Sequence, residues 1–361
     1  MRFCHRFSPP RRQDTKNDKY FLRPINFLKE FLNPVRLVEN FKTFLVSWRL
    51  GGEIVLLLFF GSQLCAQETP TKNKIAVPPL LICGNNKNVL SHVNSHGKLD
   101  WDYTLDGPIL DVQPQTPDRF LLTGGARHVA YLRKVWKGCR VLWDWESLGD
   151  VSIQSAVAMD WDENGDPALV LAADAQNPRL FLADPQSKAV KIRWEYKLPA
   201  PPMSARVCPD SNNFFVVLKN STLLEILYQE DKVVWSMGAE DGLRDVRDAV
   251  RGPWGQTYVA EGSDGVILCF DPQKKLVWKT HLPFAPSLSF RDITLSLFKK
   301  KGKRMVMAAV HWPGGPGARD VIYLLNSESG KVLGWSDRLE KGSYPSFHKA
   351  VPDLPGYHKK D

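Results

Sequence analysis

The sequence lacks several features that would place it in a familiar class of protein. Its six cysteines include no CxxC pair and no adjacent pair, so neither a zinc ribbon nor a vicinal disulfide is indicated. The apolar run at residues 54–60 is far shorter than the roughly 20 residues that a membrane-spanning helix needs. We therefore predict a mature chain without a transmembrane span.

The body of the chain also lacks a strong excess of charge. The net charge is +9, but the first 66 residues hold 11 basic and 5 acidic side chains, which leaves 37 basic and 34 acidic in the other 295. No stripe of Lys and Arg interleaved with aromatic residues occurs there. Because nucleic-acid binding depends on such clustered cations, we predict no nucleic-acid partner.

The sequence contains a short motif that is repeated six times, in which a basic residue is followed three or four positions later by tryptophan. It reads KLDW, RVLW, KIRW, KVVW, KLVW and KVLGW, and its tryptophans are spaced 41 to 57 residues apart: Trp101, Trp143, Trp194, Trp235, Trp278 and Trp335. This period is typical of β-propeller blades of four strands each. We expect each tryptophan to lie on the outermost strand and to cover the neighbouring blade.

Residues 108–147 contain one complete unit. Four short runs rich in β-branched and aromatic residues (PILDVQPQ, RFLLTGG, HVAYLRK and RVLWDWES) are separated by turn residues. The first unit has no innermost strand before Pro79, whereas Phe347–Pro352 resembles the start of the innermost strands elsewhere. We predict an all-β fold, a six-bladed β-propeller of four-stranded blades that is closed by a C-terminal strand completing the first blade. The expected organisation is a leader (1–50), a signal peptide (51–66), a linker (67–78), the propeller (79–353) and a tail (354–361).

The leader allows more than one interpretation. The apolar run followed by Gly61–Ala66 is typical of a secretory signal with cleavage after Ala66, which predicts an exported protein, periplasmic or extracellular. Residues 1–45 are then either untranslated, with a start codon nearer Val46, or an amphipathic helix on a membrane surface. Cys65 leaves lipidation open, although Leu64 stands where lipoproteins have a small residue.

The repeats resemble those of the PQQ-like (quinoprotein-like) propeller family. Residues 247–278, RDAVRGPWGQTYVAEGSDGVILCFDPQKKLVW, are similar to the repeats of PQQ-like and arylsulfotransferase-like propellers, and residues 205–235 are similar to them as well. The family includes scaffolds, such as an outer-membrane-assembly lipoprotein, and enzymes. Its quinoprotein dehydrogenases have eight blades and adjacent cysteines near the cofactor. This chain has neither, so the resemblance does not extend to PQQ as a cofactor.

Cationic residues are expected at one mouth of the central channel. Aligning the starts of the innermost strands matches Leu110, Gln154, Ser204, Arg247, Arg291 and His348. We predict that Arg247, Arg291 and His348, together with Arg127, His128 and Arg319 from nearby loops, bind a carboxylate, sulfate or phosphate. The alternative is an internal ring of ion pairs in which Asp248 and Asp292 neutralise the arginines.

Two further sites follow from side-chain chemistry. His348 and His311 are candidate acid–base groups, although no nucleophile lies at a telling spacing from either. Asp160, Asp162, Asn164 and Asp166 have the alternating oxygen ligands of a Ca²⁺ loop. The loop lacks ligands at its ninth and twelfth positions, and its Asn-Gly is also good hairpin chemistry.

These observations support three functions. The leading one is a monomeric binding or scaffold module that recognises a protein partner, an anionic small molecule or a glycan at the channel mouth. The second is a hydrolase, lyase or sulfotransferase acting on an anionic substrate at the same mouth. The third is a PQQ-dependent oxidoreductase, which the absence of adjacent cysteines argues against.

Overall fold

The computed structural model describes two separate parts of the chain. Contacts divide the chain into residues 1–66 and 67–361. The first unit contributes one short hairpin, in which β1 (Ser47–Leu50) pairs with β2 (Glu53–Leu56). In the second unit the structure describes residues 78–352 apart from 85–87, 106, 117, 125–127, 136–137, 147–150, 163–166, 186–190, 210, 212, 284–291, 301, 313–318 and 337–346.

The strands of the second unit form six antiparallel sheets of four strands each, and every sheet is one blade. From the channel to the rim, blade 1 holds β26 (Phe347–Pro352), β3 (Leu80–Gly84), β4 (Val89–Val93) and β5 (Leu99–Thr104); blade 2 holds β6 (Ile109–Thr116), β7 (Arg119–Gly124), β8 (His128–Val135) and β9 (Gly138–Glu146); blade 3 holds β10 (Ile153–Trp161), β11 (Pro167–Asp174), β12 (Arg179–Asp184) and β13 (Lys191–Lys197). In the same direction, blade 4 holds β14 (Pro202–Val207), β15 (Phe214–Leu218), β16 (Leu223–Leu227) and β17 (Lys232–Met237); blade 5 holds β18 (Val246–Arg251), β19 (Thr257–Glu261), β20 (Val266–Phe270) and β21 (Leu276–His281); blade 6 holds β22 (Asp292–Lys300), β23 (Lys303–Trp312), β24 (Arg319–Asn326) and β25 (Val332–Ser336).

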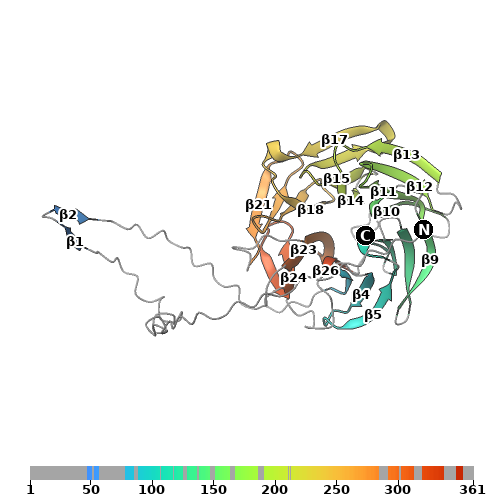
Figure 1. Ribbon diagram of the computed structural model, residues 1–361, viewed down its shortest axis with the longest axis horizontal. Helices are drawn as coiled ribbons and strands as arrows, with labels where there is room; N and C mark the ends of the chain where they lie inside the picture. Colours follow the sequence, from blue (N-terminus) through green and yellow to red (C-terminus); the bar gives the residue numbers. More distant parts are fainter. Residues whose placement is uncertain are drawn as a thin grey trace, which may run out of the picture. The chain divides into compact units, whose positions relative to one another are not determined.

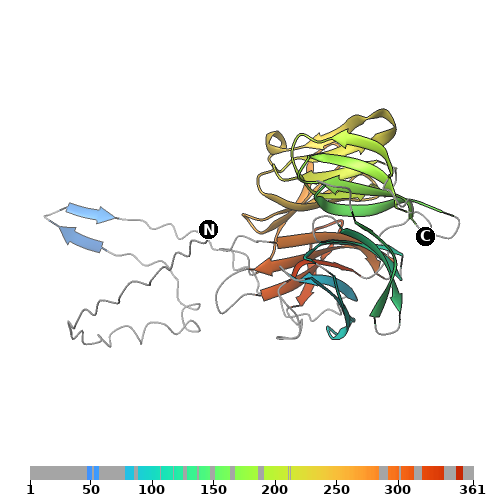
Figure 2. The ribbon, with the colours of Figure 1, turned by 45° about the vertical axis from the view of Figure 1, so that its right-hand side comes forward.

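The blades follow one another around a ring, with β9, β13, β17 and β21 on its rim (Figure 1). The predicted six-bladed propeller is confirmed, and so is its closure. The C-terminal strand β26 pairs antiparallel with β3, so that the earliest and latest strands of the ring share one sheet (Figure 2). Helix is confined, in the described residues, to two single turns, Tyr228–Glu230 and Ala239–Asp241. No described helix has the length and apolar character that crossing a bilayer would require.

The hydrophobic core lies between the blades. Each of the six apolar clusters joins two consecutive blades, and the cluster of Leu80, Ile82, Phe298 and Ala350 joins blade 6 to blade 1. Successive side chains of a strand point to opposite faces, and each face meets another blade. The inner strands are therefore apolar without alternation, as in β15 (FFVVL), which is buried throughout.

The tryptophans of the repeat join the blades at the rim. Trp194, Trp235 and Trp278 each donate an indole N–H to the turn before the outermost strand of the next blade. The acceptors are the Asp231 carboxylate, the Pro272 carbonyl at 3.2 Å and the Ser327 carbonyl at 3.1 Å. Trp101 instead stacks on Phe120 of blade 2, with ring centroids 6.3 Å apart. The predicted role is confirmed for these four; the side chain of Trp143 lies outside the described residues.

Trp335 faces the other way. Each outermost strand contains one β-bulge, a residue that has no register partner, and the residue that follows the bulge is paired again. In the other five blades this following residue is the tryptophan of the repeat. In KVLGW the residue after the bulge is Gly334, which pairs with Leu324. Because successive residues point to opposite faces, Trp335 turns towards blade 5 and joins the cluster that contains Trp278.

Candidate functional site at the channel mouth

A ring of β-bulges surrounds one end of the channel, which we call the mouth. It is the end at which the innermost strands begin, and the turns between the second and third strands of each blade lie on the same face. In five blades the pairing of the innermost strand skips its second residue: Leu110, Gln154, Met203, Arg247 and His348. In blade 6 the described pairing begins with Asp292 opposite His311 and is unbroken.

The bulge decides which residue reaches the mouth. Leu110, Gln154, Met203 and Arg247 are partly exposed, and each lies between two buried residues. The side chain of His348 lies outside the described residues. The sequence alignment is wrong in blade 4, where Met203 rather than Ser204 holds this position. A bulge adds one residue to one strand, and no feature of the sequence marks where it occurs.

Arg247 is held in an ion pair next to the mouth. Its Nε lies 3.0 Å from Oδ1 of Asp245 and its terminal nitrogen 3.1 Å from Oδ2, and its side chain is 36% exposed. A Cβ added at Gly262 would lie 2.6 Å from the Arg247 Nε, so glycine leaves the room that the guanidinium occupies. The partner is therefore Asp245, not the Asp248 that the ion-pair alternative named.

The loop that carries this pair is anchored on three sides. Ser221, in the left-handed region with φ 62°, donates its hydroxyl to the Arg244 carbonyl at 2.7 Å and accepts from the Val246 amide at 3.1 Å. The Arg244 amide donates to the buried Glu261 carboxylate at 2.9 Å, and the Gly262 amide donates to the Asp245 carbonyl. Ser221 and Glu261 were not predicted, because both act on residues 17 or more positions away.

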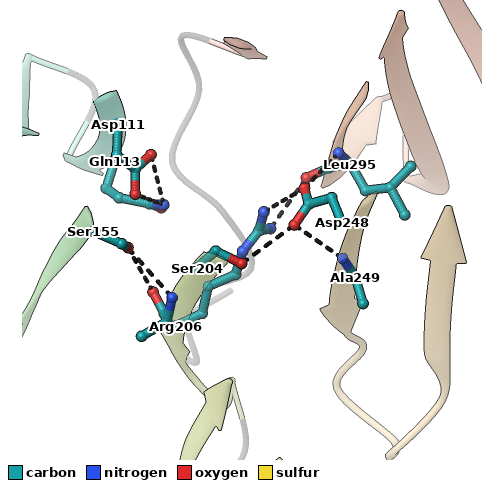
Figure 3. A network of polar contacts seen from close by, with 9 residues as sticks. Asp111, Gln113, Ser155, Ser204, Arg206, Asp248, Ala249 and Leu295 are labelled. Carbon is teal, nitrogen blue, oxygen red and sulfur yellow. Dashed lines mark hydrogen bonds and ion pairs between the residues drawn. The ribbon is translucent and has the colours of Figure 1, made fainter. Parts of the chain in front are cut away.

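Inside the channel, Asp248 joins three blades. Its carboxylate accepts the Arg206 guanidinium of blade 4 at 2.8 Å, the Leu295 amide of blade 6 at 2.8 Å, the Ala249 amide at 2.9 Å and the Ser204 hydroxyl at 3.4 Å. Arg206 also donates to the Leu295 carbonyl at 3.1 Å, so it lies between Asp248 and β22 (Figure 3). Both side chains are largely buried, at 16% and 8% exposure.

Similar contacts continue around the channel. The Ser155 hydroxyl of blade 3 bonds the backbone of Ala205 in blade 4, and the side-chain Oε1 of Gln115 in blade 2 accepts the Ala158 amide of blade 3. Asp111 accepts from the Gln113 side chain at 3.0 Å (Figure 3). Asp111, Ser155, Ser204 and Asp248 all directly follow a bulge, so the bulges place a buried polar residue next to each partly exposed one.

His311 forms a second polar group on this face. Its Nδ1 lies 2.7 Å from Oδ1 of Asp320, and its side chain is 5% exposed. Asp292, His311 and Asp320 are register partners on three adjacent strands, so their side chains share one face of blade 6. A carboxylate on Nδ1 fixes the tautomer and orientation of an imidazole, which is the arrangement that a general acid or base requires.

Two other predicted residues, His128 and Arg319, lie at the starts of strands on the same face. His128 begins β8 and lies 3.5 Å from Asp144. Arg319 begins β24 and pairs with Trp312, but its side chain lies outside the described residues. Arg127 and Arg291 lie outside them altogether. Of the proposed cluster Arg247, Arg291 and His348, only the Arg247 side chain is described.

The predicted calcium loop falls on the turn between β10 and β11, on the opposite face. Asp160 is exposed and Asp162 half-buried, and Asn164 and Asp166 lie outside the described residues. Within the described chain no cluster of three or more His, Cys, Asp or Glu residues could hold a metal.

No disulfide joins the described cysteines Cys83, Cys139, Cys208 and Cys269 to one another. Burial raises the pKa of Cys139 to about 12. Burial and the negative charge of Asp271 raise the pKa of Cys269 to about 12. Both thiols therefore stay protonated near neutral pH, and neither is activated as a nucleophile.

Comparison with known proteins adds information about the fold alone. No family model and no curated protein matches the sequence. A protein of unknown function from Bacteroides caccae matches with a TM-score of 0.56 and 15% identity, over 76% of this chain and 98% of that chain. BBS1N, solved in complex with ARL6DN, matches with a TM-score of 0.46 and 11% identity, over 70% and 85%. At 15% identity the likeness to the Bacteroides caccae protein is one of fold alone.

Proposed function

We propose that this protein is an exported β-propeller that acts as a binding or scaffold module, with its ligand site at the channel mouth. The observation that carries the proposal is the ring of bulges. Bulges are common at the rims of barrels and next to active sites, where they redirect a side chain. Here five of them lie at the same end of the channel, and the four whose side chains are described bring a partly exposed residue there.

The residues at these bulges suit a ligand that has an anionic end and a less polar end. Blades 2, 3 and 4 supply the uncharged Leu110, Gln154 and Met203, whereas blades 5 and 1 supply Arg247 and His348. Arg291 directly precedes β22 of the blade between them. Such a mouth would take the carboxylate, sulfate or phosphate of a glycan, small molecule or protein partner on the cationic side. The less polar part of the ligand would lie over blades 2–4.

The proposal also covers the protein family and the cellular location of this chain. The repeats support membership of the PQQ-like propellers, and the apolar segment ending near Ala66 supports export to the periplasm or beyond.

A thermal-shift assay of residues 67–361 tests the mouth. Wild-type protein would be screened with sulfate, phosphate, and sulfated and carboxylated sugars. A ligand at about 100 times its Kd should raise the free energy of unfolding by about 2.7 kcal/mol. The shift should disappear in Arg247→Gln and persist in Arg133→Gln, the matched control, because Arg133 is in an exposed pair with Asp118 outside the mouth. An equal shift in both variants would show that the ligand binds elsewhere.

The pair of His311 and Asp320 supports a second candidate, an enzyme acting on an anionic substrate at the same mouth. In a hydrolase or lyase, His311 would move the proton and Asp320 would orient the ring. Turnover of the same panel would then be lost in His311→Gln without a change in melting temperature. It would be retained in His96→Gln, which changes an exposed residue of the turn between β4 and β5, outside the mouth. If the wild-type protein turns over none of these compounds, the binding module remains the supported function.

A further inference from the structure

The guanidinium of Arg247 is engaged along one edge only. Its Nη2 donates to Oδ2 of Asp245 at 3.1 Å, and its Nε lies 3.0 Å from Oδ1 as an ion-pair contact without hydrogen-bond geometry. The Nε atom is buried, although the side chain as a whole is partly exposed. Among the described residues Arg247 has no other polar partner. Since a guanidinium has five N–H donors in a rigid fork, its terminal nitrogens keep donors for an oxyanion.

The surroundings of the pair keep the Asp245 carboxylate beside the guanidinium. A Cβ added at Gly262 would lie 2.6 Å from the Arg247 Nε and 3.0 Å from Oδ2 of Asp245, so glycine leaves room for both groups. The Ser221 hydroxyl bonds the backbone on both sides of Asp245, which limits the movement of this loop. The carboxylate is therefore a fixed negative charge next to any oxyanion that binds Arg247.

A second carboxylate lies close to this pair. Glu261 is the register partner of Val246, directly precedes Gly262 and is 5% exposed. Its described hydrogen bond comes from the Arg244 backbone amide, which carries no formal charge. The Arg244 side chain is exposed, so water and salt screen its charge more than that of Glu261. Within the described part of this loop, an oxyanion at Arg247 thus meets two carboxylates that solvent screens only in part.

We propose that Asp245 determines the charge selectivity of the mouth and disfavours doubly charged oxyanions relative to singly charged ones. Asp245 positions the guanidinium, and its own charge repels every negative charge that the ligand carries. A unit charge about 6–7 Å from the carboxylate should cost about tenfold in affinity at an intermediate dielectric. The site should therefore select carboxylates and sulfate esters against phosphate monoesters, whose second pKa of about 6 makes them doubly charged above neutral pH. This inference rests on the function proposed for the mouth.

Isothermal titration calorimetry with phenyl sulfate and phenyl phosphate tests the proposal. At about pH 8 the two probes share an aryl group and a tetrahedral oxyanion but differ by one charge. The protein is residues 67–361, which contain every strand of the six blades. Asp245→Asn keeps the size of the side chain and an oxygen acceptor for Arg247 but removes the charge. We expect it to lower the ratio of the phosphate Kd to the sulfate Kd about tenfold relative to wild type.

The matched control is Asp118→Asn, which removes the same charge from the exposed pair with Arg133, outside the mouth, and should leave the ratio unchanged. Arg247→Gln should weaken the binding of both probes. An unchanged ratio in Asp245→Asn, or the same change in both aspartate variants, would overturn this inference alone and leave the mouth as an anion site. If wild-type protein binds neither probe, or if Arg247→Gln binds both as wild type does, the anion site of the proposed function is overturned as well.

Discussion

Asp248 connects three blades through a single carboxylate. It is buried in the channel and accepts donors from blades 4, 5 and 6. Breaking a buried ion pair by removing one partner leaves the other charge without compensation, which costs far more than breaking an exposed pair. Asp245, three residues earlier, forms a partly exposed pair with Arg247, which water screens more than the buried one.

These two aspartates allow a matched test at the level of single residues. Asp248→Ala should lower the free energy of unfolding by about 3–5 kcal/mol, because the Arg206 guanidinium and the Leu295 amide lose their acceptor. Asp245→Ala should lower it by about 1 kcal/mol or less. Urea denaturation of both variants measures the difference. Equal losses would mean that Asp248 has no special part in joining the blades.

Among the strands, the outermost one of each blade combines an exposed side with a side that binds the next blade. In β21, Trp278 is 9% exposed and donates to Ser327 of blade 6, whereas its neighbour Val277 at the bulge is 54% exposed. The bulge separates the two roles, since it leaves Val277 unpaired and returns Trp278 to the ladder opposite Cys269.

Substitutions at these neighbours should therefore differ strongly. Trp278→Ala removes a buried indole and a hydrogen bond between blades, so we expect a loss of about 3–5 kcal/mol. Val277→Ala should change the free energy of unfolding by no more than about 0.5 kcal/mol. Chemical denaturation followed by far-UV circular dichroism would compare them. A mild effect of Trp278→Ala would show that the apolar clusters hold blades 5 and 6 together without it.

The stability of the propeller as a whole depends on the ring being closed. The cluster between blades 6 and 1 includes Ala350 of β26, and this strand covers the inner edge of β3. Without β26, one apolar face of blade 6 loses part of its cover and β3 becomes an open edge. An open, apolar edge strand readily pairs with other chains.

Truncation tests this closure. A chain that ends at residue 346 should unfold at a lower temperature over a broader range and should aggregate in size-exclusion chromatography. A chain that ends at Pro352 keeps every described strand and should behave as the full chain does. A soluble, cooperative protein without residues 347–361 would contradict the role that we assign to β26.

The architecture could be predicted from the sequence alone, for a physical reason that is local. Each blade is built from hairpins between neighbouring segments, so the repeated basic residue and tryptophan, together with the turn residues, are enough to predict blade number and strand order. The missing innermost strand before Pro79 and the unmatched strand at Phe347–Pro352 were enough to predict the closure.

Which side chains meet at the mouth depends instead on the tertiary structure. A single added residue reverses the direction of the next side chain. The bulge in β14 placed Met203 in the position expected for Ser204, and Gly334, which follows the bulge in β25, turned Trp335 towards blade 5. The same holds for partners. Asp248 binds Arg206, 42 residues away, because the curvature of the ring, which no short segment encodes, sets the distances between innermost strands. With Asp248 engaged in this way, Arg247 pairs with Asp245 instead.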